Sequence, residues 1–286
     1  MMKYAISAAT GHFGQIAIQH LLKTVPASDI VAIVRNAKKG RLVLPDSITI
    51  RQADYTDEAA LETALAGVDR LLFISSVPGG EISRQQQHAN VVSAAQAAGV
   101  KYVAYTSFAK ADTAQSPLSR DHVATEKLIK SSGLAYSFLR NAWYLENEAS
   151  YLQAGAAGKP SVYAAGAGQI SFALEREYAE AAAKVLQLAN PQPVYEFGGQ
   201  PRTYADLAKA VQQATGKPAN FQSVSGDVYR QALLAGGMAA EMVDVFASMQ
   251  QMMKDNELKV TAADLESVLG RSLKPLPDAI NEILQR

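Results

Sequence analysis

A short apolar run at the N-terminus leads straight into a glycine-containing turn and then into a helical pattern. The run covers residues 4–8, Gly11 and Gly14 follow it, and residues 14–23 carry apolar side chains at helical spacing. At such a junction Gly11 lets the backbone approach a pyrophosphate, Gly14 lets the helix pack closely, and the amides at the helix start face the phosphates. The junction predicts a nucleotide-binding α/β unit that begins at the first residues.

Strand-length apolar runs alternate with helical patterns as far as residue 140. The predicted strands cover residues 4–8, 30–34, 48–52, 70–74, 102–106 and 136–139. The predicted helices cover residues 14–23, 57–65, 85–98 and 121–131. We expect Thr56 to cap the second helix, and Gly99 and Gly133 to stop the third and fourth in the left-handed conformation. This alternation is typical of a parallel, doubly wound sheet, the Rossmann NAD(P)-binding fold.

The regular alternation ends after Asn141. Residues 153–168 are rich in glycine and alanine, helices are predicted over 177–188 and 204–215 with a strand at 194–197 between them, and the chain beyond Lys217 is mostly helical in pattern. We expect residues 1–141 to form an NADP(H)-binding Rossmann domain. Residues 142–286 are expected to form mainly a smaller substrate lobe, with a segment near 169–215 returning to the first domain.

Composition argues against several other classes of function. The chain has 27 basic and 27 acidic residues, so no net charge attracts it to nucleic acid or to an anionic membrane. It has no cysteine, which excludes disulfides, thiol nucleophiles and cysteine-ligated zinc. No run is long enough for a membrane-spanning helix, and the N-terminal run is too short for a signal peptide. We expect a cytoplasmic protein without a metal, nucleic acid or membrane partner.

One position in the turn departs from the usual glycine fingerprint. Ala8 stands where the first of three glycines is expected. An alanine there is acceptable if its φ angle is negative, but it costs about 1 kcal/mol or more if the turn requires the left-handed conformation. We expect nucleotide binding to be weakened rather than lost. The alternative is an ordinary glycine turn that binds no nucleotide.

Arg35 follows the second predicted strand, where a protein specific for NAD(H) usually carries an acidic residue for the ribose hydroxyls. A guanidinium at that place suits the 2′-phosphate of NADP(H) instead. The alternative is a solvated arginine at a strand end. Arg35 therefore favours NADP(H) over NAD(H).

The third and fourth predicted strands also end in polar residues at the edge where Rossmann domains bind ligands. Asp54 could accept a hydrogen bond from the adenine amine with Tyr55 packed nearby, although turn capping explains Asp54 almost as well. After the fourth strand, Ser75, Ser76 and Val77 could line the ribose side of the cofactor.

Several stretches beyond the glycine turn match one protein family in their order. They are residues 23–28 (KTVPAS), 31–36 (VAIVRN), 51–55 (RQADY), 97–101 (AAGVK), 105–107 (YTS), 125–127 (TEK) and 139–141 (LRN). On these residues the chain resembles the NmrA-like branch of the atypical short-chain dehydrogenases over nearly its whole length, and it is most similar there to bacterial NADPH-dependent quinone reductases. The resemblance implies hydride transfer from NADPH directly to a quinone or a similar small conjugated acceptor, without flavin or metal.

The resemblance also implies which residues surround the cofactor. They are Thr10, Gly11, His12 and Phe13 of the turn, Arg35, then Ser75, Ser76 and Val77, and residues 139–143, which include Trp143. Asn141 would lie near the nicotinamide, where its amide could orient the nicotinamide or a quinone carbonyl, although it could also cap the following turn. The chain departs from the family's glycine fingerprint at Ala8. This departure affects the expected affinity for the cofactor more than the assignment to the family.

The usual proton donor of short-chain dehydrogenases is missing from this chain. Those enzymes carry a tyrosine four residues before a lysine on one helix face, and here Val123 stands four residues before Lys127. Lys127 could contact the ribose, or it could be a solvated lysine on the helix surface. His122 could replace the tyrosine as proton donor, because an unperturbed histidine titrates near neutrality. The alternative is a surface histidine at the start of a helix.

Two classes of function remain open. The favoured class is an NADPH-dependent quinone reductase, in which Trp143 and Tyr144 could form an aromatic wall for a flat substrate or could pack an interface. The alternative is a non-catalytic NADP(H)-binding redox sensor that regulates a protein partner, as some NmrA-like relatives do. An epimerase of nucleotide sugars on the same fold would need the missing tyrosine. A homodimer is compatible with the sequence, although no spacing requires one.

Overall fold

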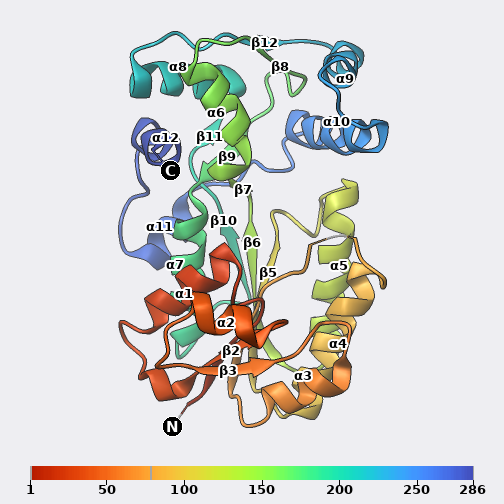
Figure 1. Cartoon of the computed structure of the whole chain (residues 1–286), viewed down its shortest axis with the longest axis vertical. Helices are drawn as coiled ribbons and strands as arrows, with labels where there is room; N and C mark the ends of the chain where they lie inside the picture. The colour runs from red at the N-terminus through yellow and green to blue at the C-terminus, as the bar shows by residue number, and fades with distance from the viewer. Residues whose placement is uncertain (1, 78, 286) are drawn as a thin grey trace. The chain divides into compact units, whose positions relative to one another are not determined.

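The computed structural model describes residues 2–77 and 79–285, which divide into two compact units (Figure 1). The first unit contains the described residues up to Ala111 together with Leu118–Asn141 and Arg176–Tyr195. The second unit contains Asp112–Pro117, Ala142–Glu175 and the described residues from Glu196 onward. The chain therefore passes between the two units several times.

A seven-stranded sheet with strand order β10-β6-β5-β4-β1-β2-β3 forms the centre of the first unit. Its strands are β1 (Tyr4–Ile6), β2 (Ile30–Val34), β3 (Thr49–Gln52), β4 (Arg70–Phe73), β5 (Tyr102–Phe108), β6 (Ala135–Asn141) and β10 (Val194–Phe197). Strands β1 to β6 pair in parallel, because a crossover returns the chain to the same edge after each strand. Every residue of β2 and β5 is buried, as expected of strands covered on both faces. The predicted doubly wound α/β fold is confirmed.

Helices cover both faces of this sheet. They are α1 (His12–Leu21), α2 (Ala37–Val43), α3 (Glu58–Leu65), α4 (Arg84–Ala97), α5 (Pro117–Ser131) and α7 (Glu175–Gln187), with a short 3₁₀ turn η1 (Ala27–Asp29). Helices α3, α4 and α5 lie on one side of the sheet, and α1 and α7 lie on the other (Figure 1).

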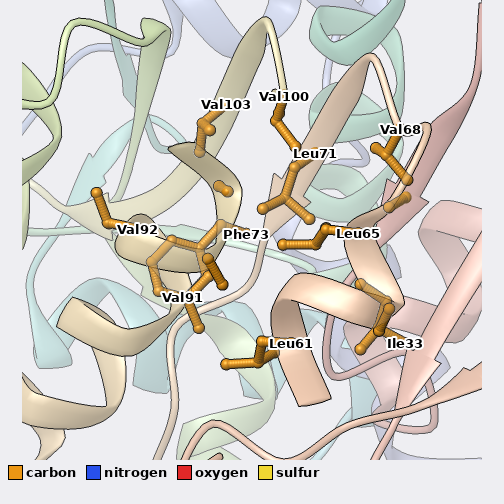
Figure 2. Packing of buried hydrophobic residues seen from close by; sticks show 14 of the residues in the cluster. Ile33, Leu61, Leu65, Val68, Leu71, Phe73, Val91, Val92, Val100 and Val103 are labelled. Atoms are coloured by element: carbon orange, nitrogen blue, oxygen red, sulfur yellow. The ribbon is translucent and has the colours of Figure 1, made fainter. Parts of the chain in front are cut away.

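A continuous hydrophobic core lies between the sheet and the helices α3 and α4. Figure 2 shows part of it, with these labelled side chains: Ile33, Leu61, Leu65, Val68, Leu71, Phe73, Val91, Val92, Val100 and Val103. Each is at most 3% exposed except Val100, which is 4% exposed, so the side chains fill the space between the layers. This packing fixes the strand ends at which the polar residues of the candidate site stand.

The helix ends test the capping predictions. Gly99 and Gly133 adopt φ angles of 73° and 78°, which confirms their left-handed conformation after α4 and α5. The prediction for Thr56 is wrong, because Asp57 caps α3 by accepting a hydrogen bond from the amide of Ala60. Thr56 binds the side chain of Asp54 instead.

Helix α2 was not predicted from the sequence. Its seven residues include Lys38, Lys39 and Gly40, so they give no apolar stripe. The helix begins because the side chain of Asn36 accepts a hydrogen bond from the amide of Lys39 at 3.0 Å.

The second unit consists of two small sheets and several helices. Strands β11 (Pro201–Arg202), β9 (Ile170–Ala173) and β7 (Trp143–Tyr144) form one sheet, and β12 (Phe221–Ser223) pairs with β8 (Ser161–Tyr163) in the other. The helices are η2 (Leu145–Glu148), α6 (Ala149–Ala156), α8 (Tyr204–Thr215), α9 (Gly226–Ala235), α10 (Ala240–Lys254), α11 (Ala263–Leu269) and α12 (Leu276–Leu284). The helix predicted over 204–215 and the strand predicted over 194–197 are present, whereas the short strands of this unit were not predicted. Among the described residues, no helix is long and apolar enough to span a membrane.

Candidate active site

The turn after β1 holds an alanine in the left-handed conformation. Ala8 has a φ angle of 48°, and its carbonyl accepts a hydrogen bond from the amide of Gly11 at 3.0 Å. The amide of Ala9 donates to the carbonyl of Ile33, which ties the turn to β2. The turn therefore requires at Ala8 the conformation that glycine adopts without strain, so the unfavourable case anticipated from the sequence is the one observed.

We expect Ala8→Gly to raise the free energy of unfolding by about 1 kcal/mol, because a left-handed alanine is strained by roughly that amount or more. We also expect it to tighten NADPH binding, since the turn no longer has to hold a strained residue. Urea unfolding and calorimetric titration measure the two effects. Ala9→Gly is the matched control and should destabilise the protein, because Ala9 is buried and has no positive φ angle. A destabilised Ala8→Gly variant would contradict the strain at Ala8.

Gly14 lets helix α1 pack directly against the turn. A Cβ atom on Gly14 would lie 2.8 Å from both the carbonyl oxygen of Ala8 and the Cα of Ala9. These are backbone atoms that cannot rotate away, so no side chain fits there. Gly11 stands at the N-cap of α1 in an extended conformation, with φ of −73° and ψ of 162°. The turn, with Thr10, His12 and Phe13 around these glycines, has the close helix-to-strand packing that a pyrophosphate site needs.

Tyr55 joins the ends of β1 and β4. Its hydroxyl is hydrogen bonded to that of Ser7 and, at 2.7 Å, to the carbonyl of Ile74, while the ring is only 7% exposed. Burial raises the pKa of Tyr55 well above its ordinary value, so the phenol stays protonated. Asp54 accepts hydrogen bonds from both the amide and the hydroxyl of Thr56 at 2.9 Å. Both side chains thus have structural partners at the carboxyl edge of the sheet.

Arg35 lies exposed directly after β2. Two further exposed cations, Lys38 and Lys39, follow it in the first turn of α2, and no acidic residue stands in that turn. Sequence reasoning singled out Arg35 alone, although the run RNAKK already placed the two lysines beside it. The end of β2 therefore offers a basic surface suited to a phosphate group.

The segment after β4 is held by side chains from neighbouring elements. The amide of Ser75 donates to the hydroxyl of Thr106 at 2.9 Å, and the amide of Ser76 donates to Nε2 of His88 at 3.0 Å. Val77 is 81% exposed. Ser75 and Ser76 are therefore fixed at the sheet edge by β5 and α4, while Val77 projects from it.

The three candidate catalytic residues lie in different environments of the first unit. Asn141 ends β6, is 6% exposed and pairs in register with Phe108, the last residue of β5. His122 is 6% exposed on α5 and packs against the ring of Phe108, so it is not the surface histidine of the alternative interpretation. Lys127 is exposed on the same helix, and Val123 is half-buried. The inward face of α5 therefore carries His122 rather than Lys127.

A buried ion pair joins α5 to the strand ends beside Asn141. Nε and Nη2 of Arg140 lie 2.9 and 2.8 Å from the two carboxylate oxygens of Glu126, and the hydroxyl of Ser107 donates to Glu126 at 2.6 Å. The two charged side chains are only 6% and 5% exposed. The sequence did not predict this ion pair, because nothing in the spacing of its residues shows that α5 brings Glu126 to β6.

Trp143 belongs to the second unit. Its indole Nε1 donates to the carboxylate of Glu148 at 2.8 Å, and the hydroxyl of Tyr204 lies 3.0 Å from the other oxygen of Glu148. Burial raises the pKa of Glu148 above its ordinary value. These contacts fix the Trp143 ring within the second unit.

In the first unit, the fold brings most of the predicted residues to the carboxyl edge of one sheet. The glycine turn follows β1, and Arg35, Asp54, Ser75 and Asn141 follow or end β2, β3, β4 and β6. This edge is where open α/β sheets bind ligands. Among the described residues, no group of three or more acidic or histidine side chains could hold a metal ion.

Comparison with known proteins agrees with this geometry. A family model described as NAD(P)H-binding matches residues 8–173. The chain is 40% identical over 281 residues to quinone oxidoreductase 2 of Escherichia coli strain K12, covering 98% of both proteins. It is 27% identical over 298 residues to an NmrA-like family domain-containing oxidoreductase, flvB, of Aspergillus flavus, covering 99% of this chain and 95% of that protein. The resemblance to the NmrA-like family is confirmed.

A solved structure shows the same fold. The crystal structure of the Escherichia coli NADPH-dependent quinone oxidoreductase QOR2 complexed with NADPH is similar with a TM-score of 0.92 and 40% sequence identity, covering 98% of this chain and 99% of that one. The similarity thus extends through both units and is not confined to the nucleotide-binding turn.

Proposed function

The chain belongs to the NAD(P)H-binding family, and we propose that it is an NADPH-dependent reductase that transfers a hydride directly to a quinone or a similar small conjugated acceptor. The observation that carries the proposal is the 40% identity to a quinone oxidoreductase over 98% of both chains. A protein that shared only the cofactor site with this oxidoreductase would be similar to it mainly near the glycine turn and the first strands. The chemistry agrees, because a quinone gains its aromatic ring on reduction and can take its proton from a donor other than the missing tyrosine.

The residues of the glycine turn fit the cofactor. Gly14 has no side chain, so the helix can approach the strand as closely as a pyrophosphate site requires. NADPH supplies the hydride when it is bound. The residues that we assign to its binding are Thr10, Gly11, His12, Phe13, Gly14, Arg35, Asp54, Tyr55, Ser75, Ser76, Val77, Lys127, Asn141 and Trp143. We assign catalytic roles to Asn141, which orients the reacting groups, to Lys127 on the ribose, and to His122.

Arg35→Ala should weaken NADPH binding about tenfold or more, because a charge-assisted hydrogen bond contributes roughly 1.5–3 kcal/mol. NADH binding should hardly change, since NADH lacks the 2′-phosphate. Titration of the two nucleotides into wild type and variant measures both affinities. Arg41→Ala, which removes a more distant cation of α2, is the matched control. If the variant bound both nucleotides equally more weakly, Arg35 would not be the residue that binds the 2′-phosphate.

The proposed reaction is tested by following the absorbance of NADPH with purified protein and a panel of small quinones, and by repeating each run with NADH. We expect quinone-dependent oxidation that prefers NADPH. Tight NADPH binding without turnover would instead support the redox sensor, the second candidate, which the valine at position 123 keeps open. Absence of NADPH binding would contradict both candidates.

We also propose that the second unit provides the substrate side of the enzyme and that the protein works in the cytoplasm, a location that the absence of cysteine supports. A homodimer is compatible with this function. Sedimentation measures the oligomeric state.

A further inference from the structure

A chain of buried polar side chains runs from the segment after β4 to helix α5. It consists of Ser76, His88, Tyr105 and His122, with Thr125 beside it. Ser76 is half-buried, and the other four side chains are at most 6% exposed. Nε2 of His88 lies 3.0 Å from the amide of Ser76 and 3.2 Å from its hydroxyl. The Tyr105 hydroxyl lies 3.0 Å from Nδ1 of His122 and 3.4 Å from Nδ1 of His88. All of these residues belong to the first unit.

The contacts of His88 determine which of its ring nitrogens carries the proton. The amide of Ser76 can only donate, so Nε2 of His88 must accept and is unprotonated. The hydroxyl of Thr125 donates its proton to the carbonyl of Asp121 at 2.7 Å, so it accepts from Nδ1 of His88 at 2.8 Å. Both contacts give the same tautomer, with the proton on Nδ1.

This tautomer determines the direction of the next hydrogen bond. Nδ1 of His88 already carries a proton and cannot accept from Tyr105. The phenol proton of Tyr105 is therefore directed to Nδ1 of His122 at 3.0 Å. His122 then carries its own proton on Nε2, the one ring nitrogen for which no hydrogen bond to the described chain is recorded. The network thus presents His122 as an Nε2–H donor.

His122 stands at the edge of the sheet where the reaction would occur. Its ring packs on that of Phe108 with centroids 6.0 Å apart, and Phe108 is in register with Asn141. At the other end of the chain, Ser76 is half-buried, and its hydroxyl lies 3.2 Å from Nε2 of His88. The network therefore extends from a half-buried serine to a donor beside the ends of β5 and β6.

Burial, together with the positive charge of Arg84, keeps both imidazoles neutral. Burial, followed by the positive charge of Arg84, lowers the pKa of His88 to about 3. Burial, followed by Arg84 and His88, lowers the pKa of His122 well below its ordinary value. Arg84 is only 8% exposed, and its Nε and Nη1 have no hydrogen-bond partner in the described chain, so its charge is poorly screened. Neutral histidines have one N–H each, which makes the tautomer decisive.

We propose that His122 is the proton donor of the reduction, and that Tyr105, within the network of His88 and Ser76, holds His122 in the donor tautomer. The proposal rests on the proposed function. In the balanced step, a quinone takes a hydride from NADPH and the Nε2 proton from His122, giving hydroquinone and NADP⁺. At the same time Nδ1 of His122 takes the phenol proton of Tyr105. After the product leaves, water returns a proton to Nε2 of His122 and Nδ1 returns its proton to Tyr105, so the network regains its starting tautomers. The overall reaction consumes one solvent proton.

The tautomers can be observed directly, because the chain has only four histidines. In long-range ¹⁵N–¹H spectra of the protein labelled at histidine, we expect a protonated Nε2 and a bare Nδ1 for His122, and the reverse for His88. His122→Asn identifies its own signals, and His20→Gln identifies those of a histidine away from the network. A protonated Nδ1 on His122 would overturn the proposal whether or not the protein reduces quinones.

The kinetic test uses two kinds of quinone. We expect His122→Asn to lower kcat about 100-fold for quinones whose hydroquinones are weak acids, because general acid catalysis contributes at least about that factor. Halogenated quinones give acidic hydroquinones that leave as anions, so their kcat should fall far less. The KM for NADPH should not change. Tyr105→Phe removes only the hydroxyl that fixes His122, so reduction of the first kind of quinone should slow by about tenfold, less than the full contribution of general acid catalysis.

The controls separate this proposal from the proposed function. His20→Gln, at a half-buried histidine on α1, should behave as wild type. Equal slowing of both kinds of quinone in His122→Asn would indicate a structural role and overturn the proposal, as would unchanged kinetics. A wild type that oxidises no NADPH with any quinone would overturn the proposed function itself.

Discussion

Gly14→Ala should weaken NADPH binding about 100-fold, because displacement of a binding group by roughly an ångström can cost that much. The new methyl group would meet the carbonyl oxygen of Ala8 and the Cα of Ala9 at 2.8 Å, so helix α1 has to move away from the turn. Overpacking of this kind also costs roughly 1–3 kcal/mol of stability. Calorimetric titration with NADPH and urea unfolding measure the two losses.

Gly226→Ala is the matched control for this variant. Gly226 also stands in the first turn of a helix, but a Cβ atom on it would have no neighbour within 4 Å. The control should bind NADPH as wild type does and should be as stable or slightly more stable, because alanine favours helix. If Gly14→Ala bound NADPH normally, the contact between α1 and the turn would not be part of the cofactor site.

Glu126→Ala should lower the free energy of unfolding by about 3–5 kcal/mol, because it removes the carboxylate that neutralises the buried guanidinium of Arg140. Arg140 makes two hydrogen bonds to this carboxylate, at 2.9 and 2.8 Å, and is only 6% exposed. The hydroxyl of Ser107 loses its acceptor at the same time. Urea unfolding measures the loss, and we expect the end of β6, with Asn141, to be disturbed as well.

Two controls separate the buried pair from ordinary surface pairs. The double variant Glu126→Leu with Arg140→Met removes both charges together and should lose much less stability than Glu126→Ala. Lys101→Ala breaks the contact with Asp69, in which the lysine is 77% exposed, and should cost at most about 1 kcal/mol. A Glu126→Ala variant as stable as Lys101→Ala would show that the buried pair does not hold α5 to the sheet.

The sequence predicted those parts of the fold that depend on local patterns. Strand β2 and the first four residues of β5 are apolar runs, and Gly99 and Gly133 end helices, so their positions follow from periodicity and backbone freedom. Capping was less certain, because Thr56 and Asp57 are adjacent residues that can both cap. The structure selects Asp57 and uses Thr56 to bind Asp54.

Properties that depend on tertiary contacts could not be predicted from the sequence. The cost of Ala8 depends on its φ angle, which the hydrogen bonds of the turn determine. His122 and Lys127 are both on α5, and only the packing of the helix shows that His122 is buried while Lys127 is exposed. The contacts between His88 and Ser76 and between Glu126 and Arg140 join separate elements, so no spacing in the sequence indicates them.

Single-turnover mixing tests directly whether this chain itself transfers a hydride from NADPH to a quinone. Protein saturated with NADPH is mixed with a quinone in the absence of oxygen, while NADPH absorbance and hydroquinone are both followed. We expect one hydroquinone for each NADPH oxidised, no semiquinone, no flavin absorbance, and a rate that falls in Arg35→Ala at limiting NADPH. Bound NADPH that is oxidised no faster than in the absence of protein would contradict the account.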